Sequence, residues 1–171
     1  QGSAGFYQGE VALSIVNTLA KKGGIITLDD LEYAMNNYPI VEKPVQGTYH
    51  GYDIVSATTP SSGGIILLEA LNMLEVYGNV GDLEHNSLEY INVVATAMQL
   101  AYGDKRKYIA DSRFVDVPIQ GLLSKAYAEE RWQKFNPNQA YLGRFIGDND
   151  FGNPWPYQSN AQKTAFSETE Y

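Results

Sequence analysis

The sequence contains no cysteine, only two histidines, and no apolar run long enough to cross a bilayer. Without cysteine, disulfides, thiolate catalysis and cysteine-based metal sites are excluded. A membrane-spanning helix needs about 20 consecutive apolar residues, so the sequence predicts no span. Basic residues are also scarce, since 12 Lys and Arg stand against 20 Asp and Glu. Nucleic-acid binding needs clustered positive charge, and we therefore expect no nucleic-acid partner.

What the sequence does contain is typical of a globular protein. Of its 171 residues, 44% are hydrophobic and 19% are charged, which is enough apolar material for one domain with a core. Thirteen tyrosines indicate large amphipathic surfaces of the kind that contact another chain. Residues 1–5 lack the pattern of a secretory leader, and the first residue is not methionine, as expected of a processed chain.

The hydrophobic periodicity predicts a mainly helical chain with a small β element, which is an α+β fold. Thr27 is a candidate N-cap with Asp30 at the capping-box position. A hairpin is expected to turn at His50 and Gly51 within a β-rich stretch. The helices are expected at residues 8–22, 27–38, 62–76, 87–102 and 119–135, the hairpin at 44–57, and a short extended piece at 114–117. Residues 104–109 either continue the fourth helix or form a turn.

The periodicity ends after Asn136, where glycines, prolines, asparagines and aromatic residues follow one another irregularly. We therefore divide the chain into a helical and β segment, residues 1–136, and an extended C-terminal tail, residues 137–171. Such a tail is expected to lie across a partner rather than on its own chain.

Two serines and two glycines, Ser61, Ser62, Gly63 and Gly64, lie between the predicted hairpin and the most apolar helix. A serine side chain can cap the first unpaired N–H groups of a helix. Glycine permits positive φ or the close approach of a backbone or ligand, and bare N–H groups at a helix start can hold an anion or oxyanion. Two interpretations stay open: a corner that needs small residues, and a wall of an active site.

The other candidate residues give no complete catalytic constellation. Neither His50 nor His85 has a partner at metal-ligand spacing, so we expect surface roles and no metal site. Nucleophile-elbow, P-loop and dinucleotide motifs are absent, and core packing explains the apolar helix without a cofactor. The sequence alone leaves open a triad of Ser61 or Ser62 with His50. The acidic pairs at residues 29–30 and 129–130 and the basic cluster at 105–107 are expected to cap or solvate helices.

Several motifs follow one another in a characteristic order. They are Phe-Tyr-Gln-Gly-Glu-Val-Ala at residues 6–12, Gly-Gly-Ile-Ile-Thr-Leu-Asp-Asp-Leu at 23–31, Tyr-His-Gly-Tyr at 49–52, Pro-Ser-Ser-Gly-Gly at 60–64, Leu-Asn-Met-Leu-Glu at 71–75, Ala-Tyr-Gly-Asp at 101–104 and Phe-Val-Asp-Val-Pro at 114–118. Arg106 and Tyr108 belong to the same series. In order and spacing these motifs resemble the large subunit of gamma-glutamyltranspeptidases, from about residue 6 to about residue 127.

The sequence departs from that family pattern at three places. Thr58-Thr59-Pro60 replaces a proline run, and Ala110-Asp111-Ser112 replaces Gly-Asp-Pro. Ala101-Tyr102-Gly103-Asp104-Lys105 stands where the family usually has Ala-Tyr-Ala-Asp-Arg. The departures point to a divergent member and leave the class of substrate open.

The resemblance implies one component of an enzyme, a four-layer αββα N-terminal nucleophile hydrolase made as a self-cleaving precursor. Such an enzyme transfers a gamma-glutamyl group, with glutathione as the obvious donor, through an acyl-threonine intermediate. The attacking threonine is activated by its own N-terminal amine. On this view no catalytic residue lies on this chain, Tyr171 immediately precedes the self-cleavage site, and the nucleophile lies on a companion small subunit. Residues 61–64 would support the site, and no cofactor is implied.

The resemblance also implies further partners and a compartment. The family's large subunit has an N-terminal half, with the arginine that holds the substrate α-carboxylate, which this sequence lacks. Either the precursor is cut a second time near Gln1, or the chain was divided there. Family habit implies the periplasm or the outside of the cell. Two alternatives remain, a cephalosporin or glutaryl acylase of the same superfamily and a non-catalytic helical module whose tail docks on a partner.

Overall fold

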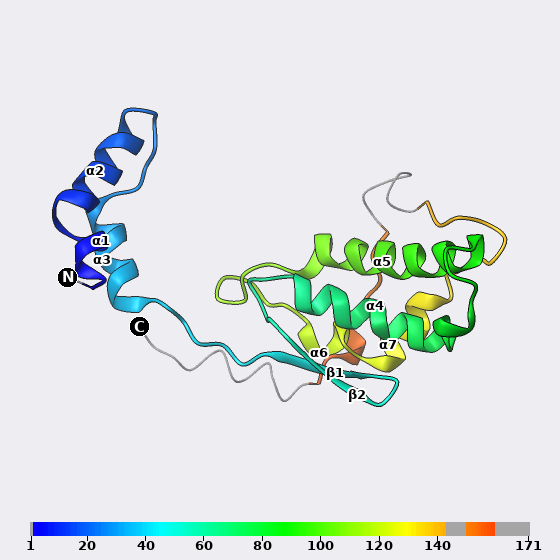
Figure 1. Ribbon diagram of the computed structural model, residues 1–171. Helices are drawn as coiled ribbons and strands as arrows, with labels where there is room; N and C mark the ends of the chain where they lie inside the picture. The colour runs from blue at the N-terminus through cyan, green and yellow to red at the C-terminus, as the bar shows by residue number, and fades with distance from the viewer. Residues whose placement is uncertain (1, 143–149, 160–171) are drawn as a thin grey trace. The chain divides into compact units, whose positions relative to one another are not determined.

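The computed structural model describes residues 2–142 and 150–159, and contacts divide the chain into two compact units with a boundary between residues 42 and 43 (Figure 1). The sequence did not predict this boundary. The described residues are mainly helical with one two-stranded sheet, which confirms the α+β class. In this part of the chain no helix combines the length and apolarity that crossing a membrane requires. The separation of residues 137–171 as a tail stays a prediction.

The first unit, residues 1–42, is built from three helices, α1 (Ala4–Tyr7), α2 (Gly9–Ala20) and α3 (Leu28–Asn37). Its predicted capping box is confirmed, because Thr27 Oγ1 accepts from Asp30 N at 3.2 Å and the Asp30 carboxylate accepts from Thr27 N at 2.8 Å. These bonds to the Thr27 backbone and hydroxyl lower the pKa of Asp30. Among the described residues of this unit, only Ala12 is buried, so the unit has almost no core of its own.

The second unit begins with the predicted hairpin, in which β1 (Val45–Tyr49) pairs antiparallel with β2 (Tyr52–Ser56). His50 and Gly51 have φ of 47° and 84°, the two positive values that a tight type I′ turn requires. Val45 and Ile54 pack into one apolar cluster with Ile65 and Leu68 of the following helix. One face of the hairpin is therefore held by that helix.

Two long helices form the centre of this unit, α4 (Gly63–Tyr77) and α5 (Leu88–Tyr108), joined by a short 3-10 turn, η1 (Val80–Asp82). They pack against each other over a core that also includes α7. Ser87 caps α5 by accepting from Tyr90 N at 3.1 Å. The helix runs on to Tyr108, so residues 104–108 continue it, and its three consecutive basic residues lie in the last turn as expected.

The prediction of one continuous helix at residues 119–135 is wrong. Two short helices, α6 (Ile119–Leu122) and α7 (Lys125–Trp132), stand in its place. Ser124 caps α7, and the carbonyl of Leu123 accepts from Asn72 Nδ2 of α4 at 2.9 Å. This tertiary bond uses a carbonyl that a continuous helix would need. The extended piece expected at residues 114–117 is also absent, since the N–H groups of Phe114 and Val115 both donate to Asp111 O in a turn.

Residues 150–159, which we call the strap, pack on their own chain, although the sequence predicted that the tail would lie across a partner. The strap includes a 3-10 turn, η2 (Trp155–Tyr157), that contacts α6. Tyr108 donates through its hydroxyl to Gly152 O at 2.8 Å, and Gly121 N donates to Gln158 Oε1 at 2.8 Å. A Cβ on Gly121 would overlap the Pro154 carbonyl oxygen. The strap therefore packs backbone to backbone, which the sequence pattern did not reveal.

Candidate functional site

The corner of residues 61–64 begins helix α4. Ser61 and Gly63 are exposed, Ser62 is half-buried and Gly64 is buried. The prediction that a serine side chain caps this helix is wrong. Ser62 has the helical angles φ −90° and ψ −16° and makes no side-chain cap bond, whereas a capping serine normally adopts an extended backbone. The first N–H groups of α4 therefore have no side-chain cap.

The two glycines of the corner have different reasons for being glycine. Neither is among the described residues with positive φ, so of the two properties of glycine considered from the sequence, only close approach applies here. A Cβ on Gly64 would overlap the Ala57 carbonyl oxygen and lie 2.8 Å from Ser56 Cβ, whereas one on Gly63 would have no neighbour closer than Ser61 Oγ at 4.0 Å. Gly64 thus serves the packing of the hairpin on α4, while Gly63 borders open space.

This difference predicts opposite outcomes for two alanine variants. Gly64→Ala is expected to lower stability by about 1–3 kcal/mol, because the new methyl group forces the hairpin away from α4. Gly63→Ala is expected to leave stability unchanged or to raise it slightly, since alanine favours a helix over glycine. Thermal unfolding of both variants of the full-length protein checks this, and equal losses for the two would contradict the assignment.

A partly buried hydrogen bond joins the corner to a segment 53 residues away. Thr59 is 3% exposed, and its Oγ1 lies 2.8 Å from Ser112 Oγ. Both residues lie in segments where the sequence departs from the pattern of the family that it resembles. The two departures therefore meet in space.

The histidines lie outside any catalytic constellation of the described residues. His50 is exposed in the hairpin turn, and its backbone N donates to Glu75 Oε1 at 2.8 Å. Lys125, which pairs with Glu75, and this backbone bond lower the pKa of Glu75. No hydrogen bond in the described part of the chain joins His50 to Ser61 or Ser62, so the triad left open by the sequence is not formed. His85 is exposed beside the ring of Tyr90.

The strongest polar cluster is buried, and the sequence reasoning missed it. Asp104 of α5 is fully buried, and its Oδ2 accepts from Arg131 Nε at 2.8 Å and from the Tyr127 hydroxyl at 2.9 Å. Its Oδ1 accepts from Gly152 N of the strap at 2.7 Å. Arg131 also donates to the carbonyls of Leu100 and Asp150, each at 3.3 Å. Burial, and secondly the charge of Asp104, raise the pKa of Tyr127, so it acts as a donor here.

Glu69 adds a second buried acid to this cluster. It is 0% exposed, and neither carboxyl oxygen has a hydrogen-bond donor among the described residues. Burial first, and then the hydrogen bond and charge of Asp104, raise its pKa well above the usual range, while Arg131 opposes the shift. A protonated Glu69 can donate to Asp104, and this reconciles a buried carboxyl with the lack of any donor beside it. Its only signal in the sequence was a charged residue within the most apolar helix.

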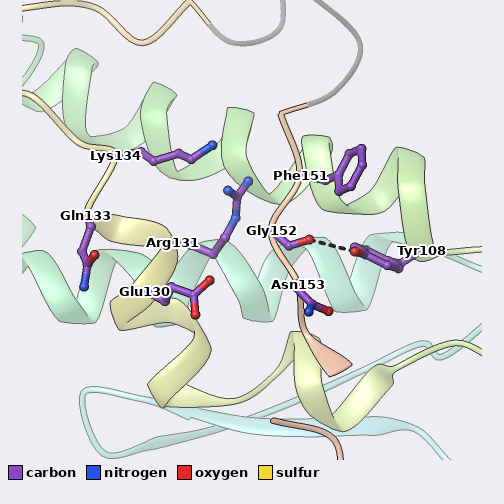
Figure 2. Close-up of a pocket in the computed structure, with 8 residues that line it drawn as sticks. All are labelled: Tyr108, Glu130, Arg131, Gln133, Lys134, Phe151, Gly152 and Asn153. Atoms are coloured by element: carbon purple, nitrogen blue, oxygen red, sulfur yellow. Dashed lines mark hydrogen bonds between the residues drawn. The ribbon is translucent and has the colours of Figure 1, made fainter. Parts of the chain in front are cut away.

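A pocket of about 640 Å³ lies between α7 and the strap, beside this cluster (Figure 2). Its two lining cations are already engaged, Arg131 by Asp104 and Lys134 by Asp150. Glu130, from the pair expected to be solvated, accepts from the Tyr157 hydroxyl at 2.7 Å. Within the described residues no group of three or more His, Asp or Glu comes together as a metal site. Tyr171 lies outside the described residues.

Comparisons with known proteins agree with one another. The family model described as Gamma-glutamyltranspeptidase matches residues 1–171. The glutathione hydrolase proenzyme of Bacillus subtilis (strain 168) is 37% identical over 162 residues, 94% of this chain and 26% of that protein. The acylase ACY 1 proenzyme of Pseudomonas sp. (strain SE83) is 35% identical over 141 residues, 82% of this chain and 24% of that protein.

A solved structure gives the same result for the fold. The crystal structure of Helicobacter pylori gamma-glutamyltranspeptidase superposes with a TM-score of 0.75 at 39% identity, covering 85% of this chain and 41% of that one. The sequence spans only about a quarter of the length of the curated relatives that it matches. Most of each relative therefore has no counterpart in these 171 residues.

Proposed function

The chain belongs to the gamma-glutamyltranspeptidase family, and we propose that it is the C-terminal part of the large subunit of an enzyme that cleaves gamma-glutamyl amides such as glutathione. The observation that carries this proposal is the match of the family model over the whole chain. The enzyme would be a multi-chain assembly, a four-layer αββα hydrolase in which this chain supplies helices and a hairpin.

The proposed chemistry needs a nucleophile from outside the described residues, which contain no catalytic constellation. A threonine hydroxyl on a companion small subunit attacks the gamma-carbonyl, and its proton passes to the threonine's own amine. That amine then gives the proton to the amide nitrogen, which leaves as an amine. Water or an acceptor amine then attacks the acyl-threonine ester and releases the hydroxyl. We propose that the cut that creates this threonine lies directly after Tyr171, which N-terminal sequencing of the companion chain would test.

The corner of residues 61–64 is proposed to form part of the wall of the substrate site. Support comes from the exposed Ser61 and Gly63 beside the uncapped start of α4. The Gly63→Ala variant supplies a second measurement here, because the structure has room for its methyl group. If substrate fills that room, kcat/KM falls by about tenfold or more at unchanged thermal stability; unchanged kinetics would assign the corner to packing alone.

An acylase is the second candidate, because the ACY 1 proenzyme is nearly as similar to the chain as the glutathione hydrolase proenzyme. A gamma-glutamyl group carries an α-amino group, which a glutaryl group lacks. A site built to bind that amine rejects a glutaryl group, which leaves its buried polar partners unpaired.

Substrate choice gives the decisive experiment. The full-length, processed protein is expected to hydrolyse a chromogenic gamma-glutamyl anilide at least about a hundredfold faster than the matching glutaryl amide. A reversed preference would support the acylase, and hydrolysis of neither substrate would support the non-catalytic module. The protein kept as uncut precursor is the control, since it lacks the free threonine amine.

The remaining partners and the compartment are proposed from family membership alone. They are the N-terminal half of the large subunit, which would supply the arginine for the α-carboxylate, and the periplasm or the outside of the cell. Mass spectrometry of the purified protein would test the first: a single large subunit spanning both halves excludes a second cut near Gln1.

A further inference from the structure

A loop of six residues, 57–62, connects β2 to α4 and carries the first half of the corner. Pro60 and Ser61 are exposed, whereas Thr59 is 3% exposed. A buried hydroxyl costs free energy unless it has a hydrogen-bond partner. The partner of Thr59 is Ser112, which lies in a turn between α5 and α6. Thr59 is therefore a point at which this loop is tied to a distant segment.

The turn that carries Ser112 is closed by its own hydrogen bonds. The carbonyl oxygen of Asp111 accepts from the N–H groups of Phe114 and Val115 at 3.0 and 3.2 Å. The carboxylate of Asp111 accepts from Arg113 N at 3.0 Å. Ser112 is half-buried and lies between the residues that make these bonds. Its backbone is thus held on both sides, so its hydroxyl offers the loop a fixed partner.

The corner lacks the attachment that a helix start usually has. The first N–H groups of α4 have no side-chain cap, and helix ends without such partners fray. Two other attachments remain. Gly64 has no Cβ and so leaves room for the Ala57 carbonyl oxygen, and Thr59 bonds Ser112. The exposed part of the corner lies between these two attachments.

We propose that Thr59 and Ser112 are positioning residues for the wall that the corner contributes to the substrate site. This inference rests on the proposed function of residues 61–64. The bond between the two hydroxyls keeps the exposed Ser61 and Gly63 in one position, and neither hydroxyl needs to touch the substrate. Both residues belong to segments that depart from the family pattern, so the bond is a feature of this chain. A displacement of about 1 Å in a group that positions substrate can lower the rate about a hundredfold.

Two substitutions separate the hydroxyl of Thr59 from its shape. In the full-length, processed protein, Thr59→Val keeps the branched side chain and removes the hydroxyl, whereas Thr59→Ser keeps the hydroxyl. On the faster of the two chromogenic amides, well below the melting temperature, kcat/KM is expected to fall about tenfold in Thr59→Val and less than about twofold in Thr59→Ser. Thr58→Val makes the same change at the neighbouring, half-buried position and should also cost less than about twofold. Ser112→Ala should match Thr59→Val, and the double variant should be no worse than either, since each removes the same bond.

Hydrogen exchange gives a measurement that needs no activity. Ile66 N donates to Ser62 O at 3.0 Å, a bond that joins the corner to α4. Exchange of this amide is expected to speed up at least about fivefold in Thr59→Val and Ser112→Ala, but not in Thr59→Ser. Unchanged exchange would overturn the inference, as would normal kinetics of Thr59→Val where Gly63→Ala is impaired. Normal kinetics of Gly63→Ala would overturn the proposed wall itself, and this inference with it.

Discussion

Replacing Asp104 by alanine is expected to destabilise the folded protein by about 3–5 kcal/mol, the cost of leaving a buried charge without its partner. Arg131 is as deeply buried as Asp104, with 1% and 0% of their side chains exposed. Without the carboxylate, its guanidinium keeps two long bonds to carbonyl oxygens and an ion pair with Asp150 at 4.0 Å. The Tyr127 hydroxyl and Gly152 N lose their acceptors as well. For a domain of this size the melting temperature should fall by roughly 6–20 °C.

The surface of the same unit offers a matched control. Asp111 also pairs with an arginine, Arg113, but their side chains are 23% and 33% exposed. Asp111→Ala is therefore expected to change the melting temperature very little, because solvent replaces the lost partner. The two variants remove the same chemical group and differ in burial. Equal losses of stability would show that burial of the pair at Asp104 contributes nothing beyond an ordinary ion pair.

The Asp104→Ala variant should also loosen the strap. Gly152 N donates to Asp104, and Tyr108, next to the cluster, donates to Gly152 O. Asp104→Ala removes the first of these bonds, so hydrogen exchange of the Gly152 amide should speed up more than exchange in the hairpin. Unchanged protection of this amide would mean that the contacts with α6 hold the strap without the cluster.

Local chemistry explains which parts of the fold the sequence predicted. The capping box at Thr27 needs only residues three positions apart, and the hairpin turn needs only two residues that tolerate positive φ. The failures lie where distant residues intervene. The break at Ser124 depends on Asn72 and the strap on Asp104, and neither partner follows from any periodicity. Ser62 resembled a cap in sequence, but its helical backbone angles place the side chain in the wrong position.

The candidate site was predicted less well than the fold, for a similar reason. The resemblance pointed to residues 61–64 as a group. In the structure Gly64 is needed for packing, whereas Gly63 borders open space. The buried cluster had one weak signal, an acid in an apolar helix, because its four side chains come from three helices. Family motifs indicated Asp104 but not Arg131 or Glu69. Pairing between helices is a tertiary property that a single sequence does not display.

Glu69 leads to the second large effect, a dependence of stability on pH. Burial raises its pKa in the folded protein, whereas in the unfolded chain it should titrate near its ordinary value of about 4.3. Between these two pKa values the folded state holds one proton more than the unfolded state. The contribution of Glu69 to the free energy of unfolding is therefore fully present below about pH 4. It is lost as the pH rises, by about 1.4 kcal/mol per pH unit, until the raised pKa is reached.

Glu69→Gln is expected to remove this dependence, because the amide keeps a donor for Asp104 and cannot ionise. The stability of the variant relative to the original protein should grow as the pH rises above 5, by up to about 1.4 kcal/mol for each unit, until the raised pKa of Glu69 is reached. Urea midpoints at each pH measure the difference, with Glu129→Gln, which removes an exposed carboxyl, as the control. Parallel curves for Glu69→Gln and the original protein would show that Glu69 is already ionised in the folded state. Two buried carboxylates would then lie next to each other. The cluster around Asp104 has too few hydrogen-bond donors to satisfy both.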